Sequence, residues 1–259
     1  MVATVLRALP SWVGSRVARL GPQAITALTG ISREDWRKVA RAFPELPADP
    51  GLLAVRARRR LQRLCGRALA SGRWTVRLEG KSLVPEPAIY VTAHIGALQA
   101  LRYVLRTRGV PAASVIGPLN LERTGPAKMD REFDRRHALD FPHTFASTSA
   151  HRLRSALKRG SLILAADLPE ARSVEAPLLG GRIRIDPRPF RLARAAGVSC
   201  RASFLTLPEN GWTLVVGDPL PAEESVAIGR FAKIYAGVAR RAPLDLDGLV
   251  YRNLTREGR

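Results

Sequence analysis

Cysteines and long apolar runs are scarce in this chain. Only two of its 259 residues are cysteines, Cys65 and Cys200, and they lie far apart in the sequence. Two distant cysteines fit neither a zinc cluster nor a disulfide framework, so we expect both to be buried core residues. His137, His143 and His151 have no spacing with one another or with acids that indicates a metal site, so no metal is expected. No run reaches the roughly 18 to 20 apolar residues that a membrane span needs, and the N-terminus has no convincing signal-peptide pattern. These absences predict a cytoplasmic protein, soluble or bound at a membrane surface.

Acidic and aromatic residues are also few. The 22 Asp and Glu residues face 42 Lys and Arg residues, which leaves a net charge of +20. Such a charge favours an anionic partner but does not separate nucleic acid from anionic lipid, and a solvated basic surface is the plainer alternative. Aromatic residues make up only 6% and are not interleaved with a basic patch, so no specific nucleic-acid partner is expected. The chain has no P-loop and no dinucleotide fingerprint, so no cofactor is expected.

The hydrophobic content, in contrast, is sufficient for a compact fold, at 46% with 25% charged residues. We divide the chain into an N-terminal helical segment, residues 1–72, and an α/β domain, residues 73–259, as one structural unit. Residues 2–20 have apolar positions at helical spacing with arginines between them. This basic amphipathic helix either lies in a lipid interface, as a membrane-facing segment, or docks on its own domain.

After residue 72 the pattern changes to alternating strands and helices. This alternation predicts an α/β fold in which helices cover a mostly parallel central sheet. Strands are expected at 74–80, 88–93, 112–116, 161–166, 199–207 and 212–216, the last two as a hairpin, and helices at 97–108, 150–159 and 189–196.

His94 is the first candidate for chemistry because it follows directly on the buried apolar strand 88–93. Ligands of α/β sheets bind at the carboxyl ends of the strands, where a strand turns into a helix. Position alone does not make a histidine catalytic, and a structural role is the commoner explanation. Asp167 ends another buried strand, and it either lines a pocket or caps the turn that follows.

The segment Val91-Thr92-Ala93-His94-Ile95-Gly96-Ala97-Leu98-Gln99 resembles the signature of the lysophospholipid acyltransferase superfamily, in which four residues separate a histidine from an acid. The likeness is to the lipid A lauroyl/myristoyl (late acyltransferase) branch and extends over about residues 35 to 250. Further segments similar to that branch follow in its order: 41–46 (Arg-Ala-Phe-Pro-Glu-Leu), 115–118, the basic cluster 131–136, 156–160, 176–180 and 190–198.

The resemblance implies transfer of an acyl group from a thioester, on acyl carrier protein or coenzyme A, to a hydroxyl or amine of a lipid, glycolipid or other acceptor. His94 would be the general base, and the residue five positions later, here Gln99, would orient its ring. Arg135 or Arg136 would bind a phosphate or the developing oxyanion, and Asp167 would line the substrate pocket. The enzyme would work on the inner face of the cell membrane.

Three positions depart from the family pattern. Gln99 stands where the family has Asp or Glu, Gly117 where it often has arginine, and Leu168 where a polar residue usually follows the aspartate. Glutamine can accept a hydrogen bond from the ring, but it carries no charge to stabilise an imidazolium. The alternative is therefore a relative with a decayed active site that binds lipid or carrier protein without catalysis.

Overall fold

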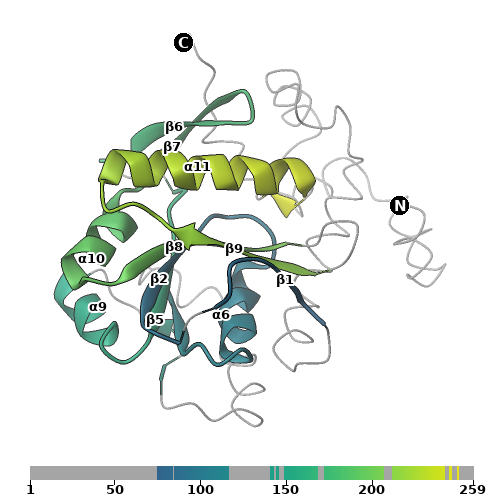
Figure 1. The fold of residues 1–259 in the computed structure, drawn as a ribbon. Helices are drawn as coiled ribbons and strands as arrows, with labels where there is room; N and C mark the ends of the chain where they lie inside the picture. The colour runs from purple at the N-terminus through teal and green to yellow at the C-terminus, as the bar shows by residue number, and fades with distance from the viewer. Residues whose placement is uncertain are drawn as a thin grey trace, which may run out of the picture.

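A computed structural model of the chain describes residues 75–83, 85–116, 141–142, 144–145, 149–168, 172–206, 212–242, 245–246 and 250. The described residues form an α/β fold around one large mixed sheet and a separate β-hairpin (Figure 1). In chain order the elements are β1 Arg77–Gly80, β2 Ala88–Thr92, α6 Leu98–Arg106, β3 Ala112–Val115, β4 Thr144–Phe145, α9 Ala150–Ala156, β5 Ser161–Ala165, β6 Val174–Leu178, β7 Gly181–Ile185, α10 Arg188–Ala196, β8 Ser199–Thr206, β9 Thr213–Pro219 and α11 Glu224–Arg241.

The large sheet, as far as the structure describes it, has seven strands in the order β1-β9-β8-β2-β5-β3-β4. All neighbours pair in parallel except β8 and β9, which form an antiparallel hairpin. The predicted mostly parallel α/β class is thus confirmed. The apolar strands β2 and β5 lie side by side near the middle, where both faces of the sheet are covered.

Side chains of β2 alternate between two cores. Ile89 and Val91 belong to a core that includes side chains of α9, α10 and α11, whereas Ala88 and Tyr90 belong to a core with α6. Helix α6 therefore covers one face of the sheet, and the other three helices cover the opposite face (Figure 1). The antiparallel hairpin β6–β7 packs against α11 on that second face.

The expected strands and helices after residue 74 are present, with ends shifted by a few residues. The prediction did not include β6 and β7, the short β4, or the 18-residue helix α11. Helix α11 nevertheless has sequence signals: Glu224 in its first turn, Arg240 and Arg241 in its last turn, and a buried apolar face spaced at three and four residues.

The predicted helical segment 1–72 and its amphipathic helix at 2–20 lie outside the described residues. Within the described ranges, no helix is long and apolar enough to cross a membrane.

Candidate active site

The site lies at the carboxyl ends of β2 and β5. These strands are parallel neighbours in a register that pairs Thr92 with Ala165. His94 stands two residues beyond Thr92, and Asp167 two residues beyond Ala165. The register therefore brings both residues to the same level at the carboxyl ends of these central strands. Two backbone hydrogen bonds extend this alignment: the Ala166 N–H donates to Thr92 O at 2.9 Å, and the Asp186 N–H donates to Ala166 O at 2.7 Å.

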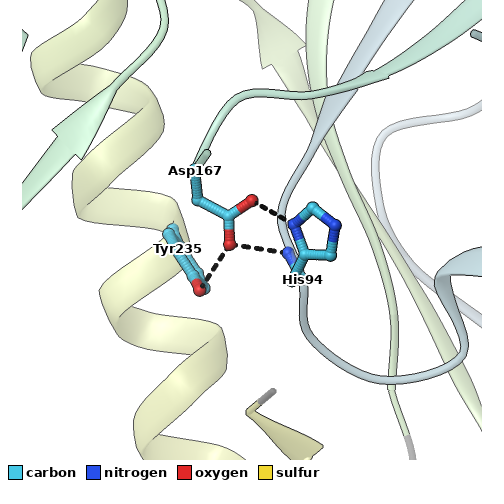
Figure 2. Close-up of polar contacts among 3 residues, drawn as sticks. All are labelled: His94, Asp167 and Tyr235. Carbon is cyan, nitrogen blue, oxygen red and sulfur yellow. Dashed lines mark hydrogen bonds and ion pairs between the residues drawn. The ribbon is translucent and has the colours of Figure 1, made fainter. Parts of the chain in front are cut away.

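The carboxylate of Asp167 binds His94 at two points (Figure 2). Its Oδ1 lies 2.7 Å from the ring Nδ1, and its Oδ2 accepts the His94 backbone N–H at 2.7 Å. An ionised carboxylate can only accept hydrogen bonds, so Nδ1 carries the proton and the neutral ring keeps Nε2 as its basic nitrogen. The two contacts together fix both the tautomer and the orientation of the imidazole.

Tyr235 on α11 completes the arrangement. Its hydroxyl donates to Asp167 Oδ2 at 3.3 Å, so the same oxygen accepts from a backbone amide and a phenol (Figure 2). The tyrosine is fully buried, and its ring stacks on Phe204 of β8 with centroids 5.6 Å apart. His94 and Asp167 thus follow strands of the sheet, whereas helix α11 on the second face contributes the tyrosine that hydrogen-bonds to the carboxylate.

Burial separates the two members of the pair. The Asp167 side chain has no exposed surface, whereas the His94 side chain keeps 22% of its surface exposed. A buried carboxylate interacts with an imidazolium in a medium of low dielectric, which strengthens the attraction. The ring is accessible from outside while its orienting partner is not, as expected for a general base that must meet a substrate.

The backbone after His94 forms a tight turn that requires glycine. Gly96 has a φ of 66°, and a Cβ added there would lie 2.0 Å from the carbonyl oxygen of Leu205. The Gly96 N–H donates to Asp245 O and the Ala97 N–H to Leu205 O, both at 2.8 Å. The turn is thereby tied to β8 and to the C-terminal part of the chain, which holds His94 at the sheet edge.

Gln99 does not have the position that the resemblance assigns to it. It is exposed on α6, and the partner of Nδ1 is Asp167, 73 residues from His94 in the chain. The structure therefore has Asp167, and not Gln99, at the ring Nδ1. Asp167 contacts both the backbone and the ring of His94. Arg135 and Arg136 lie outside the described residues.

Sequence reasoning also missed Tyr235 because it did not predict α11. The apolar face of that helix, Ile228, Phe231, Ala232 and Tyr235, is a signal that predicts both the helix and the burial of this tyrosine. Only the packing of α11 against the sheet shows that the hydroxyl meets Asp167.

The arrangement is that of a base with a buried carboxylate, which can remove a proton from a hydroxyl, a thiol or a water molecule. Among the described residues there is no group of three or more His, Cys, Asp or Glu side chains that could hold a metal ion. A scan against protein-family models gives no match, and neither does a search of curated proteins.

Proposed function

We propose that this protein is an acyltransferase that moves an acyl group from a thioester to a hydroxyl or amine of a lipid, glycolipid or other acceptor. The observation that carries the proposal is the contact of His94 Nδ1 with the buried Asp167 carboxylate at 2.7 Å. This pair lies at the strand ends where the segment resembling the acyltransferase signature stands. The ordered similarity of further segments to the late acyltransferases supports the choice of reaction.

In the proposed reaction, Nε2 of His94 takes the proton of the acceptor as its oxygen or nitrogen attacks the thioester carbonyl. The resulting imidazolium is stabilised by the Asp167 carboxylate through Nδ1–H. Collapse of the tetrahedral intermediate breaks the carbon–sulfur bond, and the imidazolium returns its proton to the departing thiolate. The acyl group is then joined to the acceptor and His94 is neutral again.

Asp167 also bears on the alternative, a relative with a decayed active site. That alternative is motivated by Gln99, Gly117 and Leu168, and the first of these concerns the missing charge beside the ring. Asp167 supplies a negative charge at the same ring nitrogen, and a carboxylate is costly to bury, so its retention beside an accessible histidine favours a working base.

The proposed donor is acyl carrier protein or acyl coenzyme A, and the proposed location is the inner membrane surface. The net charge of +20 suits an acidic carrier protein, the phosphates of coenzyme A and anionic lipid alike. The donor is therefore a matter for experiment.

The test is to incubate the purified protein with a donor, either acylated acyl carrier protein or acyl coenzyme A, and with lipid or glycolipid acceptors. The acyl group of the donor is radiolabelled, so that its transfer to the acceptor can be measured. His94→Ala is expected to lower transfer by about 10² to 10⁴-fold, the usual contribution of a positioned base. His151→Ala is the matched control, because His151 is an exposed histidine on α9. Transfer that survives unchanged in His94→Ala would refute the mechanism.

The Gln99→Glu variant tests whether Asp167 or the residue at position 99 orients the His94 ring. If Asp167 orients His94, a carboxylate at the exposed position 99 is expected to change turnover by less than about twofold, because a solvated surface charge interacts weakly. A large gain in turnover would return the orienting role to position 99. No transfer in either form, with either donor, would favour the non-catalytic alternative.

A further inference from the structure

A second candidate site is a pocket of about 630 Å³ beyond the start of β2, at the opposite end of this strand from His94. Glu86 and Pro87, which precede β2, line it together with the C-terminal ends of α9 and α10 and the start of β8. Three basic residues are among its lining: Arg154, Lys158 and Arg201. The volume is within the usual range of small-molecule sites.

This pocket is separate from the candidate active site. Its residues lie before the first residue of β2, Ala88, and around the first residue of β8, Ser199, whereas His94 lies beyond the last residue of β2. The five residues of β2 alone separate the two by about 17 Å, at roughly 3.3 Å per strand residue. A ligand in the pocket would therefore not touch the His94 imidazole.

The charges of the pocket are unbalanced. In the part of the chain that the structure describes, Arg154, Lys158 and Arg201 make no ion pair, and the lining contains a single carboxylate, Glu86. Many other cations of the described chain are paired with acids: Arg77, Lys81, Arg182, Arg188, Arg191, Arg230 and Arg241. The pocket thus brings three cations without an ion pair together with one carboxylate.

Arg201 is the most informative of the three cations because it is partly buried on a strand. Its Nη1 donates one long hydrogen bond, 3.4 Å to Gly217 O, and its Nε is buried with no partner among the described residues. A charge removed from water normally has a close counter-charge or a full set of hydrogen bonds. Arg201 has neither, which indicates that a counter-anion belongs in the pocket.

The neighbouring helix ends do not account for this charge. Arg154 lies in the last turn of α9 and Lys158 just beyond it, where cations interact favourably with the helix carbonyls. This effect explains a cation beside a helix end, but it does not explain Arg201, which lies on β8.

We propose that the pocket binds a phosphate-bearing ligand through Arg154, Lys158 and Arg201. Three cations against one carboxylate leave a surplus that matches the charge of a phosphate monoester, between −1.5 and −2 at neutral pH as a rough range. Arginine presents paired N–H donors to phosphate oxygens, and lysine adds a point charge. Two sources carry this chemistry, a soluble phosphate ester and the headgroup of a lipid.

The first experiment measures binding of inorganic phosphate and glycerol phosphate by isothermal titration calorimetry at constant ionic strength, with chloride as the competing anion. Lys158→Gln and Arg201→Gln are expected to weaken binding about tenfold or more, since each removes a charge-assisted contact. The matched control is Arg152→Gln, because Arg152 is exposed on α9 and does not line the pocket. Lys158 is exposed, so its variant stays informative even if Arg201→Gln does not fold.

The second experiment identifies the source of the phosphate by flotation with vesicles of phosphatidylcholine, with and without phosphatidate. Binding to phosphatidate that falls in Lys158→Gln but not in Arg152→Gln supports a headgroup, and calorimetric binding alone supports a soluble ester. Equal loss in both variants would show unspecific attraction to a basic chain and overturn the proposal, as would no binding in either assay. His94→Ala is expected to bind phosphate normally, so this test stands apart from acyl transfer.

Discussion

Replacing Asp167 with asparagine tests the candidate site at the level of single protons. The carboxylate accepts hydrogen bonds at both oxygens: Oδ1 faces the ring Nδ1, and Oδ2 faces the His94 backbone N–H and the Tyr235 hydroxyl. Asparagine has almost the same shape but only one accepting oxygen, and its amide nitrogen is a donor. The substitution therefore forces a choice of which neighbour loses its acceptor.

The backbone decides that choice. A backbone N–H cannot turn away or give up its proton, so an amide nitrogen placed 2.7 Å from it would set two donors face to face. The asparagine oxygen is expected to take the place of Oδ2 and its NH₂ to face Nδ1. The ring must then accept at Nδ1, and the proton of the neutral imidazole moves to Nε2.

A ring protonated at Nε2 cannot serve as a base on its exposed side. In serine proteases, the same exchange of carboxylate for amide lowers turnover about 10⁴-fold through the wrong tautomer. We expect Asp167→Asn to lower acyl transfer by about 10³ to 10⁴-fold, which corresponds to roughly 4 to 5.5 kcal/mol of transition-state free energy.

The tautomer can be measured without any substrate by NMR of protein labelled with ¹⁵N-histidine. The neutral ring of His94 is expected to carry its proton on Nδ1 in the native protein and on Nε2 in Asp167→Asn. His151, which is exposed on α9, is the internal control and should not change. A variant that keeps the Nδ1 tautomer, or turnover within tenfold of the native protein, would refute this reasoning.

Three further predictions concern stability and reactivity. Tyr235→Phe keeps the stacked ring and removes only the hydroxyl, so we expect urea denaturation to show a loss of about 1 kcal/mol in stability, and turnover to fall by under about tenfold. No loss of stability would contradict the hydrogen bond between Tyr235 and Asp167. Gly96→Ala is expected to destabilise more than Gly109→Ala in the same assay, because both glycines have positive φ but only a Cβ at Gly96 meets backbone, at 2.0 Å. The positive φ alone costs about 1 to 2 kcal/mol, so equal losses would refute the steric argument. Burial raises the pKa of the Cys200 thiol to about 12, so in a Cys65→Ser background iodoacetamide should label native Cys200 at pH 8 far more slowly than in urea. The pKa difference between the folded and unfolded protein contributes its full stabilisation below the unfolded pKa of 9.0. This contribution is lost as the pH rises toward 12, because the unfolded protein then releases the thiol proton and the folded protein does not.

Much of the fold follows from local sequence patterns. The apolar runs that became β2 and β5 predict buried strands, and their alternation with helices predicts a mostly parallel sheet. The β6–β7 hairpin was harder to predict because β6 contains a proline and β7 has arginine at every second position. The local pattern of α11, in contrast, is sufficient to predict a helix.

By itself, the sequence determined that His94 and Asp167 each stand just after a buried strand. It did not determine that β2 and β5 are neighbours, because strand order depends on packing between segments far apart in the chain. Only the tertiary structure brought Asp167 to the His94 ring across 73 residues and placed Tyr235 behind it. The family resemblance implied Gln99 as the ring partner, whereas the parallel register of β2 and β5 brings Asp167 to the ring.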